Sequence, residues 1–176
     1  MTSRMRNSRP PGMPSPSTVP SVLFVCLGNI CRSPLAEAAL REAAQRDGLA
    51  IMVDSAGTGA WHIGHPPDPR SHAEALRHGI DISSYRARQV TLADFARFDR
   101  IVAMDRQNLG DLEAMAPAGA RARLSLLLDH VAGMEGCDVI DPYYGGPQGF
   151  TTAWEHASRA ARQIVSDLRS LSSVNR

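Results

Sequence analysis

Residues 21–34 read S-V-L-F-V-C-L-G-N-I-C-R-S-P, and this stretch decides the fold. The run 22–25 combines β-branched, aromatic and leucine side chains, which predicts a buried strand. Ser33 is a good N-cap for a helix, and Pro34 suits the first helical position. A loop over 26–32 therefore joins a strand end to a helix start, where backbone N–H groups and the helix dipole favour an anion. The same field would hold a cysteine as its thiolate.

The segments that follow predict a parallel sheet. A helix over 35–47 and a strand over 51–53 complete a strand–helix–strand unit within about 35 residues, which requires parallel strands. Asp68 and Pro69 would open a helix over 71–78, and further helices are expected near 91–94 and over 105–115. A strand is expected over 100–104, and a fourth strand or short apolar segment over 122–128. The last helix would run from 150, and Thr152 and Glu155 would cap it. The prediction is an α/β protein with three layers, α/β/α, around a four-stranded parallel sheet. Ligands of such sheets bind beyond the carboxyl ends of the strands, where Cys26, Ser55 and Asp105 would lie.

Composition divides the chain into a short leader and one domain. The chain has 176 residues, and residues 1–20 hold five Pro and three Arg without an acidic residue, which predicts a disordered leader before a domain over 21–176. The domain carries 16 Arg against 18 acidic residues, a net charge of −2 that argues against a nucleic-acid partner. No apolar run has the length of a membrane span, so no membrane association is expected.

The three cysteines, Cys26, Cys31 and Cys137, are too few and too unevenly spaced for a disulfide framework. Their number and the absence of a secretory segment predict a cytoplasmic protein. Their spacing also fits no structural zinc site, and neither a metal nor a cofactor is expected.

Cys26 and Arg32 have the chemistry of phosphoryl transfer. A thiolate can attack phosphorus while the planar guanidinium of Arg32 holds two phosphate oxygens, and the backbone amides over 27–32 would hold the same oxygens. The pattern alone fits a buried structural cysteine at a strand end equally well.

The run V-C-L-G-N-I-C-R-S-P resembles the phosphate-binding signature of the low-molecular-weight protein tyrosine phosphatases. The resemblance extends from residue 21 to the end of the chain. Its further motifs are D-S-A-G at 54–57, G-A-W-H-I-G at 59–64, P-D-P-R at 67–70, A-R-Q-V-T at 87–91, M-D at 104–105 and D-P-Y-Y-G at 141–145. It implies a phosphotyrosine phosphatase I-like fold.

The resemblance also implies catalytic roles. Cys26 would be the nucleophile that forms a cysteinyl-phosphate, and Arg32 would bind the phosphate and stabilise the transition state. Asp141 would protonate the leaving phenolate and then activate water. Ser33 would hydrogen-bond the Cys26 sulfur. The rest of the phosphate-binding loop would be Leu27, Gly28, Asn29, Ile30 and Cys31.

Other positions would support the loop or receive the substrate. Asn29 and Ser55 would lock the loop through side-chain hydrogen bonds, although Ser55 also fits a simple turn cap. Tyr85 stands where the family usually has a histidine, and its phenol can still donate to the Ser55–Asn29 pair. Cys31 would form a reversible disulfide with the nucleophile, or would only pack in the loop.

An aromatic wall would be formed by Trp61, Tyr143 and Tyr144, and it suits a phosphotyrosyl ring by stacking. Trp61 fits an anchor in a Gly-rich loop as well, and Asp141 fits a turn-forming Asp-Pro.

These residues indicate a metal-independent phosphatase for protein phosphotyrosine and aryl phosphates. Its partner would be a phosphotyrosine-containing protein, such as a bacterial tyrosine kinase, and the enzyme would be a monomer or weak dimer. An arsenate reductase on the same fold would need further cysteines, and none lies between Val53 and Cys137. A protein-arginine phosphatase tends to carry Thr where Ile30 stands. A non-enzymatic phosphate-binding module would not need Asp141.

Overall fold

The computed structural model describes residues 19–174. The described chain contains four strands, five α-helices and one 3₁₀ helix. In chain order they are β1 (Ser21–Cys26), α1 (Arg32–Arg46), β2 (Met52–Gly57), α2 (Pro69–Arg77), α3 (Asp94–Arg97), β3 (Arg100–Ala103), α4 (Arg106–Met115), β4 (Arg123–Leu126), η1 (Leu127–His130) and α5 (Gln148–Val174).

The four strands form one parallel sheet in the order β2-β1-β3-β4. This arrangement confirms the predicted α/β fold. From β1 the chain passes to β2 on one side and then to β3 on the other, so the direction of winding reverses at the carboxyl end of β1. Such a reversal leaves a crevice in which ligands bind. Cys26 is the last residue of β1 and lies at this point.

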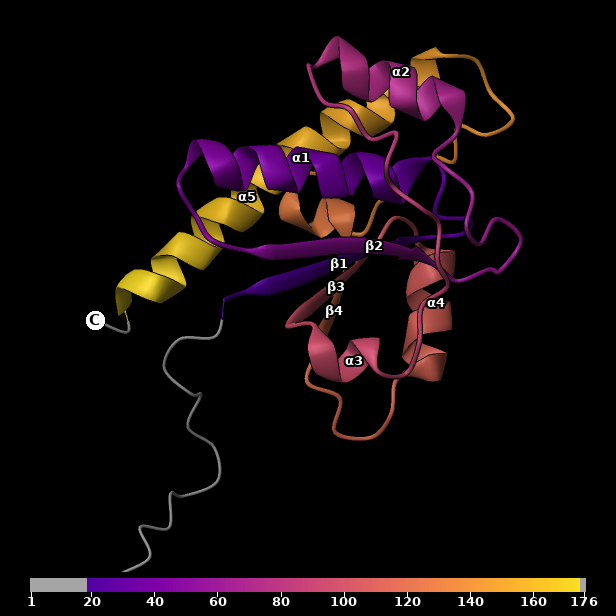
Figure 1. Ribbon diagram of the computed structural model, residues 1–176. Helices are drawn as coiled ribbons and strands as arrows, with labels where there is room; N and C mark the ends of the chain where they lie inside the picture. The colour runs from indigo at the N-terminus through magenta and orange to yellow at the C-terminus, as the bar shows by residue number, and fades with distance from the viewer. Residues whose placement is uncertain (1–18, 175–176) are drawn as a thin grey trace, which may run out of the picture.

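Helices cover both faces of the sheet. Figure 1 shows α1 and α5 over one face and α3 and α4 over the other, which gives the three layers predicted from the sequence. Side chains of β1 alternate between two buried clusters: Val22 and Phe24 pack on the α1/α5 side, while Leu23 and Val25 pack on the other. A strand buried on both faces explains why 22–25 is apolar throughout.

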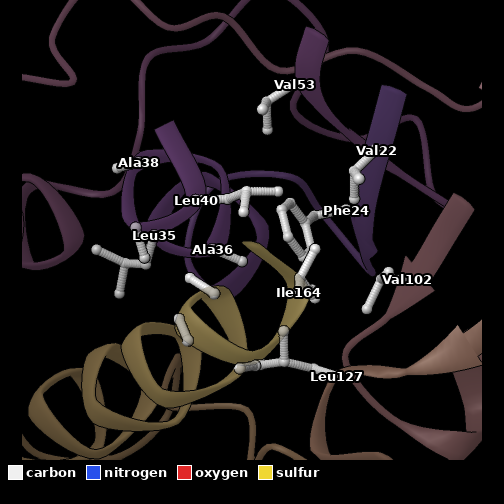
Figure 2. Packing of buried hydrophobic residues seen from close by; sticks show 14 of the residues in the cluster. Val22, Phe24, Leu35, Ala36, Ala38, Leu40, Val53, Val102, Leu127 and Ile164 are labelled. Carbon is white, nitrogen blue, oxygen red and sulfur yellow. The ribbon is translucent and has the colours of Figure 1, made fainter. Parts of the chain in front are cut away.

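The core on the α1/α5 side is centred on Phe24. Figure 2 shows its ring between Leu40 of α1 and Ile164 of α5. Phe24 is fully buried, and transfer of its side chain from water into the core stabilises the fold by about 3 kcal/mol. This packing fixes α1, and with it the loop that precedes α1, against the sheet.

Strand β2 is longer than predicted. The sequence indicated a strand over 51–53, but pairing with β1 continues to the Cys26–Gly57 pair, and Gly57 also bridges to Gln89. A Cβ atom on Gly57 would lie 2.7 Å from the Leu27 carbonyl oxygen, so only glycine permits this close approach. Ser55 consequently lies inside a strand and not after it.

Two helix starts differ from the prediction. The capping box at Thr152 and Glu155 is wrong, because α5 begins at Gln148 and the Thr152 hydroxyl donates to the Gln148 carbonyl within the first turn. The N-cap predicted at Ser33 is also wrong, because α1 begins at Arg32 with Cys31 as its N-cap, and Ser33 lies in the first turn. Helix α2 opens as predicted at Asp68 and Pro69: Asp68 is the N-cap and accepts from the Arg70 N–H.

The expected fourth strand is shorter than its segment. The stretch predicted over 122–128 divides into β4 and η1, because the chain turns into 3₁₀ geometry at Leu127. The side chain of Asp129 stabilises this turn by accepting from the Leu126 N–H at 2.9 Å.

The predicted leader, residues 1–20, lies outside the described residues apart from its last two. Within residues 19–174, no helix has the length and apolar character needed to cross a membrane.

Candidate active site

The loop after β1 surrounds the sulfur of Cys26. The Asn29 N–H points at Cys26 Sγ from 3.3 Å, and the Ser33 hydroxyl lies 3.0 Å from the same atom. Cys26 is buried, and Ser33, in the first turn of α1, is fully buried. The contact between Ser33 and the sulfur that the sequence led us to expect is therefore formed.

Asn29 holds the loop in its bent conformation. Its φ of 56° is in the left-handed region, which costs most side chains about 1–2 kcal/mol but suits Asn better. The amide nitrogen donates to Ser33 Oγ at 2.8 Å and to Ser55 Oγ at 2.9 Å, and the amide oxygen accepts from the Arg88 N–H at 3.0 Å. The bond to Ser55 matches the expectation. The bonds to Ser33 and from the Arg88 N–H were not predicted, although Arg88 belongs to the quoted A-R-Q motif.

Arg32 is fixed by partners from two other segments, the end of β3 and the stretch before α5. Its Nη1 donates to Asp105 Oδ2 at 2.7 Å and to the Val139 carbonyl at 2.8 Å. Its Nη2 lies 3.5 Å from Asp141 Oδ2. Burial acts to lower the pKa of Arg32, but the neighbouring acidic groups, Cys26 among them, outweigh burial and raise that pKa above its usual value.

Asp105 was not predicted to hold Arg32. The sequence placed Asp105 after the third strand and at the start of the next helix, without a contact to Arg32. In the structure it caps α4 by accepting from the Asn108 N–H at 2.7 Å, which aims its second carboxylate oxygen at Arg32. A signal was present, because an aspartate that follows a strand and precedes a helix is an N-cap at the ligand-binding edge of the sheet.

The segment that carries Asp141 is anchored at both of its ends. Before it, the Val139 N–H donates to the Met104 carbonyl at 2.8 Å, and Asp138 accepts from the backbone and side chain of Arg106. After it, the Tyr143 N–H donates to Asp141 Oδ1 at 3.1 Å.

Arg70 of α2 ties the same segment to the phosphate-binding loop. Arg70 donates to the Tyr143 carbonyl at 3.0 Å and pairs with Asp68, whose N–H donates to the Ile30 carbonyl at 2.8 Å. The P-D-P-R motif therefore connects the two halves of the site.

These elements surround a cleft of about 400 Å³. Its lining brings together the predicted nucleophile, the arginine predicted to bind phosphate, the predicted acid and all three residues of the predicted aromatic wall. It consists of Cys26, Leu27, Gly28, Ile30, Cys31, Arg32, Trp61, His62, Asp141, Tyr143 and Tyr144. Trp61 and Tyr144 are 71% and 96% exposed, so their rings stand at the mouth of the cleft.

Comparison with known proteins agrees with this geometry. The family profile described as Low molecular weight phosphotyrosine protein phosphatase matches residues 21–173. The chain belongs to this family. The phosphatase is thus a hydrolase of the protein-tyrosine-phosphatase class, as its sequence motifs predicted.

Individual relatives cover most of the chain. The low molecular weight protein-tyrosine-phosphatase YfkJ of Bacillus subtilis is 49% identical over 128 residues, which make up 72% of this chain and 82% of that protein. Its crystal structure has a TM-score of 0.81 at 40% identity and covers 89% of this chain and 98% of that one. The human low molecular weight phosphotyrosine protein phosphatase is 42% identical over 148 residues, or 82% of this chain and 93% of that protein. A Drosophila arginine phosphatase has a TM-score of 0.79 at 34% identity and covers 84% of this chain and 96% of that one.

The support of the phosphatase loop differs from the expectation at Tyr85. Among the described residues, the Tyr85 phenol hydrogen-bonds neither Ser55 nor Asn29. The Ser55 hydroxyl donates instead to Glu37 Oε2 at 2.6 Å. Tyr85 is half-buried near this carboxylate, and burial raises the pKa of its phenol to about 12. Glu37 is a residue that sequence reasoning missed, because its contact with β2 depends on how α1 packs.

His62 is a second residue that the sequence did not single out. It lines the cleft beside Trp61, and a methyl group on Gly28 would lie 2.9 Å from its Cδ2 atom. The imidazole therefore packs on the phosphate-binding loop and forms part of the entrance.

All three cysteines are free thiols. Cys31 is buried and shares the cleft with Cys26, whereas Cys137 is exposed. Burial raises the pKa of Cys31 well above its usual range, so this thiol is protonated near neutral pH.

Proposed function

We propose that the phosphatase hydrolyses phosphotyrosine in proteins, and aryl phosphates, by a two-step displacement through a cysteinyl-phosphate that needs no metal ion. The observation that carries the proposal is the convergence of Cys26, Arg32 and Asp141 in one cleft bordered by aromatic rings. A nucleophile, an anion-binding group and a proton donor are the three functions that the reaction requires.

In the first step, Cys26 Sγ attacks phosphorus, and the bond from phosphorus to the phenolic oxygen breaks. Arg32 and the backbone amides of the loop bind the phosphate oxygens as charge develops on them. Asp141 gives its proton to the leaving oxygen, because a phenolate with a conjugate-acid pKa of about 10 leaves poorly at neutral pH. The aromatic rings at the cleft mouth hold the phenyl ring of the substrate.

In the second step, the Asp141 carboxylate takes a proton from water, and the water oxygen attacks phosphorus. The phosphorus–sulfur bond breaks, inorganic phosphate leaves, and Cys26 regains its starting form. The Ser33 hydroxyl, 3.0 Å from the sulfur, stabilises the negative charge that returns to it. Asn29 and Ser55 hold the loop in shape through both steps.

The natural partner in this proposal is a phosphotyrosine-containing protein, such as a bacterial tyrosine kinase. The phosphatase would act in the cytoplasm as a monomer or weak dimer. The chain has only three cysteines, too few and too unevenly spaced for a disulfide framework, which supports a reducing compartment.

An arginine phosphatase is the second candidate, because two solved relatives, the Drosophila protein and YwlE, are described as such. Ile30 favours the aryl substrate in this chain. Its side chain lines the cleft and packs with Cys31, Ala87 and Phe150, so this part of the cleft lining is apolar. An arsenate reductase would need a cysteine relay, and the third cysteine, Cys137, does not line the cleft.

A substrate panel tests the function. Wild-type protein should hydrolyse phosphotyrosyl peptides far faster than phosphoseryl or phosphoarginyl peptides, without reducing arsenate, and chelators should leave the rate unchanged. Preference for phosphoarginine would replace the proposal by the second candidate. Cys26→Ser should abolish turnover in a folded protein, and Asp141→Asn should slow phenyl phosphate far more than p-nitrophenyl phosphate, whose leaving group needs less help. Equal losses for both esters would remove Asp141 as the acid.

Cys31 is also proposed as the redox partner of Cys26. Hydrogen peroxide would accept two electrons from the two thiols as their disulfide forms, and this protects the nucleophile from further oxidation. Activity lost to peroxide should return with dithiothreitol in the wild type, whereas in Cys31→Ser the loss should be largely irreversible. Equal recovery in both proteins would contradict this role.

A further inference from the structure

The hydroxyl group of Ser55 supports the phosphate-binding loop only in one orientation. Ser55 Oγ accepts from the Asn29 amide nitrogen at 2.9 Å and donates to Glu37 Oε2 at 2.6 Å. A serine hydroxyl has one proton, and the amide nitrogen can only donate. The bond to Asn29 therefore persists only while the Ser55 proton points elsewhere, and Glu37 is the group that draws it away.

Glu37 is in turn held by Arg41, one turn later in α1. Arg41 Nε and Nη2 donate to Glu37 Oε1 at 3.1 Å and 2.8 Å, and the same Nη2 donates to the Val53 carbonyl of β2. Glu37 is only 5% exposed. Burial raises the pKa of Glu37, and the hydrogen bonds from Ser55 and Arg41 oppose that rise. Arg41 thus favours the ionised carboxylate, which can accept from Ser55.

The spacing of three residues along α1 allows the hydrogen bonds to form one connected chain. Ser33, Glu37 and Arg41 are four residues apart and so share one face of α1. Hydrogen bonds lead from the half-exposed Arg41 guanidinium through Glu37, Ser55 and Asn29 to Ser33, which touches the Cys26 sulfur.

Tyr85 does not replace this support. It lines a cavity of about 80 Å³ together with Asn29, Glu37 and Ser55. In the part of the chain that the structure describes, Tyr85 hydrogen-bonds neither Ser55 nor Asn29, and Ser55 donates to Glu37 of α1 instead.

We propose that Glu37 and Arg41 are positioning residues of the phosphatase. Arg41 holds Glu37 as a carboxylate acceptor, Glu37 orients the Ser55 hydroxyl, and Ser55 with Asn29 keeps the loop in the shape that binds phosphate. This inference rests on the proposed function where kcat is measured. The Kd for inorganic phosphate is a second measurement, and it needs no turnover.

Arg41→Ala is the first test, because a half-exposed side chain can be removed without unfolding the core. Its kcat for p-nitrophenyl phosphate should fall about tenfold and its Kd for inorganic phosphate should rise about fivefold, as expected when a catalytic loop shifts slightly. Arg41→Lys should recover most of both losses, because it restores a cation beside the carboxylate.

Arg46→Ala is the matched control. Arg46 pairs with Glu42 at the same i,i+4 spacing on the same helix, but that pair is exposed and distant in sequence from the loop. Its kcat and phosphate Kd should stay within about twofold of the wild type, as is usual for surface pairs.

A double-mutant cycle tests whether Arg41 acts through Glu37. In the Glu37→Gln background, adding Arg41→Ala should cause no further loss of kcat or phosphate affinity. Multiplying losses would show that Arg41 acts independently and would overturn the proposal. Wild-type kcat and phosphate Kd in Arg41→Ala, measured well below its melting temperature, would overturn it as well. If the wild-type protein binds phosphate but hydrolyses no phosphate ester, the proposed function is wrong. The role of Glu37 and Arg41 can still be tested in that case, because calorimetry compares the phosphate Kd of the variants with that of the wild type.

Discussion

Replacing Asn29 by alanine tests how the phosphate-binding loop is held. The variant loses three side-chain hydrogen bonds, to Ser33, Ser55 and the Arg88 N–H. At about 1 kcal/mol each, they total about 3 kcal/mol. Alanine at a φ of 56° adds about 1 kcal/mol of strain. We expect the free energy of unfolding to fall by about 4 kcal/mol, which lowers the melting temperature by about 10 °C in a chain of this size.

Asn29→Gly separates the two contributions. Glycine loses the same hydrogen bonds but adopts the positive φ without strain, so this variant should be more stable than the alanine variant. Urea denaturation followed by tryptophan fluorescence gives both free energies, and p-nitrophenyl phosphate kinetics on the folded variants report loop geometry. An alanine variant within about 1 kcal/mol of the wild type would refute the reasoning, because one hydrogen bond alone is worth that much. A glycine variant less stable than the alanine variant would refute the strain argument.

Three further predictions concern the surroundings of the loop. Asp105→Asn should raise the phosphate Kd at least about tenfold by removing the charged partner of Arg32, and unchanged calorimetric affinity would contradict this. Asp138→Asn, which weakens the anchor before Asp141, should slow phenyl phosphate more than p-nitrophenyl phosphate; identical slowing of the two esters would count against it. Burial acts to raise the pKa of Asp94, but hydrogen bonds from Arg88 and Thr91 outweigh it, and the pKa is lowered. The stability that this lowered pKa provides is present above the ordinary Asp pKa of about 3.9 and is lost as the pH falls through the pKa in the folded protein. The wild type should therefore lose more stability than Asp94→Asn between about pH 5 and pH 3, measured by urea titration. Parallel pH profiles of the two proteins would disprove this.

The sheet was predictable because its signals are local. The apolar run 22–25 had to be a strand buried on both faces, and strand–helix–strand order had to give parallel pairing. The strand lengths were less predictable: β2 continues to Gly57 because Cys26 and Gln89 pair with it from two sides, and neither partner is near it in sequence.

The cleft was predictable to the extent that its residues belong to recognisable motifs. Cys26 and Arg32 belong to one loop motif, and Asp141 belongs with Tyr143 and Tyr144 to a second motif. The partners that orient them were not. Asp105 reaches Arg32 from α4, and Arg70 reaches the Tyr143 carbonyl from α2, so both contacts depend on how helices pack at the end of the sheet.

The sequence by itself determined the strand, the loop and the following helix that create an anion site, because backbone geometry and the helix dipole follow from neighbouring residues. The helix begins at Arg32, two residues before the predicted first position at Pro34. The sequence left open which side chain hydrogen-bonds Ser55 and so supports the loop. The histidine expected there is Tyr85 in this chain. Only the packing of α1 against β2 showed that Glu37 accepts a hydrogen bond from the Ser55 hydroxyl instead. The physical reason is that a hydrogen bond requires two atoms within about 3 Å, and for residues far apart in sequence only tertiary packing sets that distance.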